Sequence, residues 1–462
     1  PLYSSAASDV YKRQVLGLAA CTGGTNAPSQ EVPASSSSQA GENSSQPASS
    51  AVNPASIEGT VRVWTAYSEE QGMGALAEAF HEKYPNITVE ITKANNTADD
   101  NVKIDTALMA GGEIDVMLSY GLPRTKARVD AGNFMELTDL VKEAGLDSKR
   151  DYGAEYLYDG KLYTLPIDGI ATFVAINTTK WNEAGLGEIP TEWTWDEYLE
   201  ASKAMTKDGV FGGSDYQSLE AAYYPVIQVE GGDVFYDVKG GGLSRFTTDP
   251  EFAIALNRKY KAEVEDKIWY KLTDYRANGI KAPDTFLTRQ TAMTITTNMF
   301  RFLRDTENYP IDFKVAFAPY PVKEKGQTNY MSGITTFGQL AITNTCENKE
   351  AAWEFAKFFA TEGNIYLSMA GHLPMYKGTN MDNAINVIFG SEEAAEKLID
   401  VDSFKKVVFN FSAPTYQDSV AYAECEAVWR EVLMYIMSGE MTVEDGLKEM
   451  QTRCDKIIQE EK

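Results

Sequence analysis

The alternation of strand-like and helix-like segments between residues 60 and 120 constrains the fold more than any other feature. Apolar side chains at helical spacing predict two helices, over 73–80 and 104–108. Three strand-like segments surround them, two with period-2 alternation and a third apolar enough to be buried on both faces: 61–64, 87–91 and 114–118. This order predicts an α/β fold in which a parallel sheet is covered by helices.

Ligands of such sheets bind beyond the carboxyl ends of the strands. In this chain those ends carry Trp64, Tyr67 and Glu69 after the first strand and Tyr120 after the third. An aromatic ring covers the C–H face of a sugar, and a carboxylate accepts hydrogen bonds from its hydroxyls. We therefore take these four residues as candidate ligand contacts. Trp64 equally suits a core position, and Glu69 equally suits an acid in the first turn of a helix.

The charge balance and the metal-binding residue types exclude several functions. Lys and Arg number 42 against 67 Asp and Glu, a net charge of −25, so we expect no nucleic-acid partner, which would require clustered basic residues. His81, His372 and the four cysteines lack zinc-site spacing, and we expect no metal or cofactor. Cys346, Cys425 and Cys454 are compatible with one disulfide plus a free thiol or with three buried thiols.

The amino-terminal region predicts an anchored protein on a tether. Residues 1–14 lack an initiating Met and resemble translated adapter sequence, so we exclude them from the fold. Residues 18–21 look like a lipobox. We therefore interpret residues 1–21 as adapter sequence followed by the end of a lipoprotein signal, with Cys21 as the acylated residue. The blander alternative is a chance apolar run before an ordinary cysteine. Residues 22–56 are rich in Ser, Ala, Gln and Pro and are expected to form a disordered tether.

The rest of the chain reads as two or three domains of ordinary size, at about 100–200 residues each. Further expected elements include a strand over 170–177 and a helix over 195–205 that opens with a Thr194–Glu197 capping box. After residue 60 no run of eighteen apolar residues exists, so we expect no membrane-spanning segment there.

Several short motifs in a fixed order resemble the family 1 extracellular solute-binding proteins of bacterial ABC importers, a mostly sugar-binding group that includes maltose-binding protein. The resemblance covers about residues 57–458 and departs from the family pattern at Ile114, where proline is usual. The motifs that carry it are Val61-Arg62-Val63-Trp64-Thr65, Gly112-Glu113-Ile114-Asp115-Val116, Leu162-Tyr163-Thr164-Leu165-Pro166, Ile176-Asn177, residues 190–197, Thr291-Ala292-Met293, residues 352–358 and His372-Leu373-Pro374.

The resemblance implies a two-lobed, type II periplasmic-binding-protein-like fold, with each lobe a sheet flanked by helices and a hinged cleft between them. Lobe 1 would comprise residues 57–166 and 336–373, and lobe 2 residues 167–332 and 374–462. The chain would then cross between the lobes near 165–170, 332–336 and 373–376, where Gly and Pro residues can absorb a hinge rotation.

The same resemblance adds further candidate contacts at the crossings and in the second lobe. Asp168 at the first crossing is expected to face the cleft, and Gly333 and Thr335 lie at the second. Tyr224 lies in an apolar, helix-like stretch, and Asn298 stands where the family often has an aromatic residue. For four other residues we expect no ligand contact: a structural role for Asp115, a core position for Trp353, a helix surface for His81 and a loop for His372.

The implied function is capture of a mono- or oligosaccharide by lobe closure and delivery to the transmembrane subunits of an ABC permease, without a chemical step. The protein would be a monomer whose only attachment to the membrane is its lipid anchor. It would lie on the outer face of the cytoplasmic membrane or in the periplasm. Three alternatives stay open. They are a glycoside hydrolase, which needs two carboxylates across one bond, a carbohydrate-adhesion or sensor module, and a binding protein for a non-sugar solute such as a polyamine.

Overall fold

The computed structural model describes residues 53–215, 234–237, 241–280, 284–297, 299–329, 331–410 and 420–461. The chain divides into two units, Pro1–Ser56 and Ile57–Lys462, and the second is described below. Three predicted residues, Cys21, Tyr224 and Asn298, lie outside the described residues. None of the described helices is both long and apolar enough to cross a bilayer.

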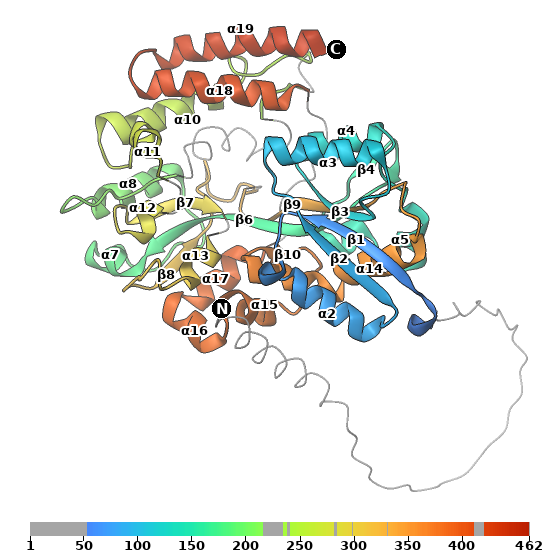
Figure 1. Cartoon of the computed structure of the whole chain (residues 1–462). Coiled ribbons are helices and arrows are strands. Elements are labelled where there is room, and N and C mark those ends of the chain that lie inside the picture. The colour runs from blue at the N-terminus through green and yellow to red at the C-terminus, as the bar shows by residue number, and fades with distance from the viewer. Residues whose placement is uncertain are drawn as a thin grey trace, which may run out of the picture. The chain divides into compact units, whose positions relative to one another are not determined.

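The described strands of the second unit form one large mixed sheet and a small hairpin (Figure 1). The large sheet has the order β10-β6-β9-β3-β1-β2, with β7 and β8 also paired to β6. Its strands are β1 (Gly59–Thr65), β2 (Ile87–Lys93), β3 (Val116–Tyr120), β6 (Leu165–Asn177), β7 (Met293–Thr297), β8 (Val315–Ala318), β9 (Gly333–Ile342) and β10 (Leu373–Pro374). The hairpin pairs β4 (Leu157–Tyr158) with β5 (Lys161–Leu162).

The parallel sheet predicted from residues 60–120 is confirmed for its three strands, and the later strands join it through antiparallel pairings. β1 pairs in parallel with both β2 and β3, as strand-helix-strand connections require. The pairings of β9 with β3 and β6, and of β6 with β7, β8 and β10, are all antiparallel. These later strands enter the sheet from distant parts of the chain, so no right-handed crossover fixes their direction.

Strand β6 joins two parts of the sheet. Residues Leu165 to Thr172 pair with β9, which continues to β3, whereas Phe173 to Asn177 pair with β7 and β8. The strand predicted over 170–177 is therefore too short by five residues. The three segments predicted to cross between lobes coincide with β6, the start of β9 and β10, and β6 pairs with both of the others.

Helices cover both faces of the β1–β3 region (Figure 1). Helices α3 and α4 lie on one side, and α2 and α14 on the other. In this first part of the fold the described helices are α2 (Met73–Lys83), α3 (Ala98–Ala110), α4 (Leu122–Asp130), α5 (Thr138–Glu143), α6 (Ser148–Tyr152) and α14 (Lys349–Ala360). On the α3 side, Ile104 and Leu108 pack on Met117 of β3 and Ala341 of β9.

The remaining described helices surround the other half of β6 or stack beyond it. They are α7 (Thr178–Glu183), α8 (Trp195–Met205), α10 (Pro250–Tyr260), α11 (Leu272–Asn278), α12 (Asp284–Leu287), α13 (Phe300–Arg304), α15 (Met381–Phe389), α16 (Glu392–Leu398), α17 (Val401–Val408), α18 (Tyr422–Met437) and α19 (Val443–Glu461). The capping box predicted at the start of α8 is confirmed. Helices α10, α18 and α19 share one apolar core built around Trp429.

A buried ionic group, here called the Lys259 cluster, lies inside this second part. It consists of Lys259 of α10, Glu263 of the following π-helical turn (Lys261–Glu265) and Asp215, all at most 1% exposed. The Lys259 ammonium lies 2.9 Å from Asp215 Oδ2 and also bonds to Glu263, whose other oxygen accepts a 2.8 Å hydrogen bond from Leu272 N. Lys259 and Glu263 are four residues apart, so they lie on the same face of the helix.

Several structural expectations are confirmed. Asp115 is buried and accepts hydrogen bonds from the backbone and guanidinium of Arg62, so its role is structural. Trp353 lies in the core, and His81 is exposed on α2. The alternatives for Cys346, Cys425 and Cys454 resolve in favour of three buried free thiols.

Candidate functional site

The turn after β1 directs Tyr67 into the protein rather than toward solvent. Tyr67 follows β1 by two residues and precedes a 3₁₀ helix, Glu69–Gln71, which Ser68 and Gln71 close with a capping box. Its backbone N–H lies 3.3 Å from the Thr65 hydroxyl, and only 5% of the residue is exposed. The phenol ring therefore lies beneath the carboxyl edge of the sheet, where the sequence placed a ligand contact.

Tyr67 meets two residues that are distant in sequence. Its hydroxyl donates a 2.5 Å hydrogen bond to Asp168 Oδ2 of β6, and Asp168 Oδ1 lies 2.6 Å from His372 Nδ1, just before β10. The Tyr67 oxygen is also 3.0 Å from His372 Nδ1. Asp168 is fully buried and His372 is 7% exposed. Both carboxylate oxygens are thus engaged, as a buried charge requires.

Four aromatic rings, each in contact with two of the others, surround these polar groups. Tyr67 packs edge-on against His372 and Tyr120, with centroid distances of 5.0 and 6.4 Å. The fourth ring is Phe337 of β9, whose centroid lies 5.3 Å from that of Tyr120 and 5.4 Å from that of His372. Phe337 is 37% exposed, whereas the other three rings are buried. We call Tyr67, Tyr120, Asp168, Phe337 and His372 the Tyr67 cluster; it presents one aromatic ring to solvent above buried hydrogen-bonding groups.

The charge of Asp168 shapes the chemistry of the neighbouring phenols. Burial, reinforced by the Asp168 carboxylate, raises the pKa of Tyr67 well above its usual value, so the hydroxyl stays protonated and donates. The pKa of Tyr120 is raised for the same two reasons, burial being the larger. The Tyr120 hydroxyl lies near Thr65 and Tyr67, which oppose this rise, but it is buried and makes no hydrogen bond of good geometry with the described residues.

Glycine at position 338 allows the cluster to close. Gly338 pairs with Tyr120 of β3 on one side and with Asp168 of β6 on the other. A β-carbon at this position would lie 2.9 Å from Tyr120 Cε1 and 3.1 Å from Asp168 Cβ, closer than ordinary van der Waals contact. The absence of a side chain therefore permits both neighbours to approach β9.

The other predicted contacts among the described residues are not members of the Tyr67 cluster. Trp64 is half-buried and packs on the apolar core beneath α3, and Glu69 is exposed at the start of its 3₁₀ helix. Gly333 is buried and Thr335 half-buried, on the stretch of β9 that pairs with Thr172 and Ile170. The hydrogen bonds and ring contacts given above for the cluster involve none of these four residues.

Sequence reasoning missed two members of the cluster. Phe337 carries no motif and lies inside β9. His372 was assigned to a loop, which is correct, but not to the site, although it directly precedes the third predicted crossing. Two signals were available in the sequence: the position beside a crossing and, for His372, the motif His372-Leu373-Pro374.

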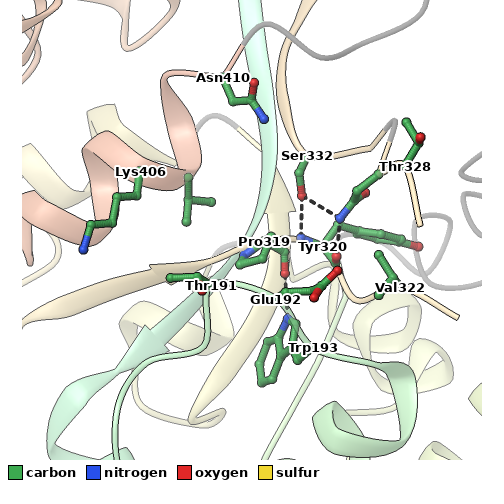
Figure 2. Close-up of a pocket in the computed structure, with 12 residues that line it drawn as sticks. Thr191, Glu192, Trp193, Pro319, Tyr320, Val322, Thr328, Ser332, Lys406 and Asn410 are labelled. Atoms are coloured by element: carbon green, nitrogen blue, oxygen red, sulfur yellow. Dashed lines mark hydrogen bonds between the residues drawn. The ribbon is translucent and has the colours of Figure 1, made fainter. Parts of the chain in front are cut away.

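A separate cavity of about 260 Å³ lies near the start of β9 (Figure 2). Trp193, Tyr320 and Ser332 are among the residues that line it, together with Asn410. The lining comprises Thr191, Glu192, Trp193, Pro319, Tyr320, Val322, Thr328, Asn329, Ser332, Lys406, Val407 and Asn410. None of the described residues predicted to bind ligand lines it, so it is distinct from the Tyr67 cluster.

Comparison with known proteins yields a family match and many similar structures. Diacetylchitobiose binding protein DasA of Streptomyces coelicolor is 30% identical over 147 residues, 32% of this chain and 33% of that protein, so the match spans about a third of its length. A sugar transporter of Rhizobium etli in an open conformation shares the fold, with TM-score 0.70, 20% identity and coverage of 86% of this chain and 98% of that one. The substrate-binding protein Lmo0181 of Listeria monocytogenes, in complex with cycloalternan, gives TM-score 0.66, 19% identity and coverage of 86% and 98%.

These structures share the two-lobed α/β architecture that the sequence predicted. The sequence profile of the bacterial extracellular solute-binding proteins matches residues 66–365, well over half of the chain. That range contains four members of the Tyr67 cluster, and the fifth, His372, follows it by seven residues. The chain therefore belongs to the bacterial extracellular solute-binding protein family.

Proposed function

We propose that this protein is the lipid-anchored, substrate-binding component of an ABC importer that captures a mono- or oligosaccharide outside the cytoplasmic membrane. Closure of the two lobes holds the sugar, and the closed form docks on the permease. Closure requires a ligand that binds the closed form more tightly than the open one. The ligand leaves unchanged, because the function needs no chemical step.

The Tyr67 cluster is the observation that favours a carbohydrate. Phe337 offers an exposed ring for the C–H face of a sugar, and buried phenol and carboxylate groups lie directly behind it. The proposed ligand contacts around the Phe337 ring are Trp64, Tyr67, Glu69, Tyr120, Gly333 and Thr335. The predicted set also includes Asp168, Tyr224 and Asn298. The names of the sugar-binding relatives point the same way.

Isothermal titration calorimetry tests the carbohydrate assignment. The panel contains N,N′-diacetylchitobiose, maltose, longer α-glucans and monosaccharides, with spermidine and glycerophosphocholine as non-sugar probes. We expect one class of sugar to bind with a Kd in the micromolar range or below. Tight binding of a non-sugar probe, with no response to any sugar, would reassign the ligand.

The enzyme alternative is less well supported by the same geometry. Glycoside hydrolases use two carboxylates that flank the scissile bond. Among the described residues, Asp168 is the carboxylate of the Tyr67 cluster, and both of its oxygens are engaged. Incubating the protein with its tightest-binding oligosaccharide and analysing the mixture by chromatography should return the sugar intact.

The anchor and the permease require separate tests. Expression behind a bacterial lipoprotein signal peptide that ends at Cys21 should direct the protein to the membrane fraction, and Cys21→Ser should release it. A sensor or adhesion module would bind sugar equally well, so uptake of labelled sugar by vesicles carrying the permease distinguishes import from those roles. Analytical ultracentrifugation tests the proposed monomer.

A further inference from the structure

The histidine of the Tyr67 cluster occupies a position that links its polar and aromatic halves. His372 Nδ1 bonds to Asp168, and the imidazole ring contacts both Tyr67 and Phe337. Tyr120 reaches Phe337 and Tyr67 but makes no hydrogen bond of good geometry to Asp168 among the described residues. His372 therefore connects the buried carboxylate to the one exposed ring.

The backbone places His372 at this junction. β10 begins at the next residue and pairs antiparallel with β6, Leu373 opposite Gly169 and Pro374 opposite Asp168. The short β10 is thus fixed in register beside the first crossing strand. β6 also pairs with β9 at Gly338, the residue after Phe337. The segments that carry Asp168, Phe337 and His372 are therefore neighbours in one sheet.

Among the contacts of His372, the hydrogen bond to Asp168 should be the most sensitive to substitution. Tyr67 and His372 are the partners that the structure gives to this fully buried carboxylate. A buried carboxylate that loses a donor must move, recruit water or become protonated. A movement of Asp168 would displace Tyr67 and would disturb the pairing of β6 with β9 at Gly338. Phe337, the residue before Gly338, would then move as well.

We propose that His372 is a positioning residue for ligand binding: through its bond to Asp168 it holds Tyr67 and the exposed Phe337 ring in the geometry that receives the ligand. The inference rests on the function proposed above and deepens it. His372 itself is 7% exposed and acts through its neighbours. Residues that fix the orientation of direct contacts govern affinity when the site must be held within a fraction of an ångström.

Three substitutions separate the hydrogen bond from mere space filling. In His372→Asn the amide nitrogen falls near the place of Nδ1 and can still donate to Asp168. In His372→Gln the amide falls near Nε2, so Asp168 Oδ1 loses its donor, and His372→Leu fills the space without any donor. The only other histidine, His81, is exposed on α2 and provides the matched control His81→Leu.

Titration calorimetry with N,N′-diacetylchitobiose and maltose, together with thermal unfolding of the same samples, measures the effect. We expect His372→Asn and His81→Leu to bind within about threefold of the wild type and His372→Gln and His372→Leu to lose at least tenfold, or about 1.4 kcal/mol. If His372→Leu does not fold, His372→Gln decides. Wild-type affinity in His372→Gln, or a loss in His372→Asn equal to that in His372→Gln, would overturn the proposal.

Crystal structures of the unliganded His372→Asn and His372→Gln variants make the test independent of the sugar. We expect Tyr67, Asp168 and Phe337 to keep their positions in the first variant and to shift in the second. If neither sugar binds the wild type, the carbohydrate probes have failed and these structures alone decide whether His372 positions the cluster. Identical cluster geometry in both variants would refute it.

Discussion

Two buried polar clusters in this protein are built on opposite plans. The Lys259 cluster is assembled largely within one helical region, with Lys259 and Glu263 one helical turn apart, and an ammonium neutralises two carboxylates. The Tyr67 cluster joins five segments that are distant in the sequence, and its single carboxylate is satisfied by a phenol and an imidazole. The first is sealed, whereas the second ends in a ring that is 37% exposed.

The difference separates stability from recognition. A buried ion pair costs much desolvation and is retained only while every charge has its partner, so changes there should affect folding first. The Tyr67 cluster lies at strand ends and next to the exposed Phe337, so changes there should affect binding more than folding. The predictions below test this division, in order of decreasing effect.

Lys259→Met should be the most damaging change. It leaves Asp215 and Glu263 buried without their cation, which typically costs about 3–5 kcal/mol of unfolding free energy. Urea denaturation followed by tryptophan fluorescence measures it. The control is Lys261→Met, which removes an exposed lysine two residues away and should leave the denaturation midpoint unchanged. Equal midpoints for both variants would show that the cluster contributes nothing to stability.

Glu263 should make stability depend on pH. Burial, with a smaller contribution from Asp215, raises the pKa of Glu263 from 4.5 to about 7 against the opposing effect of Lys259. The folded state then binds an extra proton between these values, so the contribution is present below pH 4.5 and is lost as the pH rises through about 7. The upper bound is about 3 kcal/mol, at 1.36 kcal/mol per pH unit.

Glu263→Gln, which is neutral at every pH, should flatten this part of the stability profile. Urea denaturation at intervals between pH 4.5 and 8 provides the measurement. Glu265→Gln, an exposed neighbour on the same turn, should keep the wild-type slope. A slope that persists in Glu263→Gln would assign the pH dependence to another group.

Gly338→Ala should affect both stability and binding. Its β-carbon would press on Tyr120 and Asp168, and crowding of this kind typically costs about 1–3 kcal/mol. Sugar affinity should fall as well, because β9 carries Phe337. Denaturation and calorimetry on the same preparation test both effects. If affinity is unchanged while stability falls, the cluster is not coupled to the ligand.

Phe337→Ala should have the smallest effect on folding and a selective effect on binding. The ring is already partly exposed, so unfolding should change by less than about 1 kcal/mol. Sugar affinity should drop about tenfold, since the aromatic face is lost. Phe302→Ala, on α13 outside the cluster, is a suitable control for loss of an aromatic ring. Unchanged affinity in Phe337→Ala would remove this ring from the site.

Local sequence patterns predicted much of the first part of the fold. Period-2 alternation placed β1 and β2, and helical spacing placed α2, because the apolar face of each element is written in consecutive residues. Strand β6 was underestimated because its first residues include Pro166 and Gly169, which disfavour strands in local propensity. Its pairing with β9 and β10 overrides that propensity.

The candidate site was only partly accessible from sequence. Tyr67, Tyr120 and Asp168 were nominated separately, from strand ends and a crossing, and the structure brings them into contact with one another. Phe337 and His372 were not nominated, because their importance depends on which strands lie beside β6.

By itself the sequence determined the strand-helix order, the capping of α8 and the family motifs, since these depend on residues within a few positions of one another. Only the tertiary structure decided that the chain pairs β6 with β9 and β10, and hence that Asp168, Phe337 and His372 meet. Such pairings join residues up to about two hundred positions apart. No local pattern specifies them, because register is selected by burial of the whole sheet.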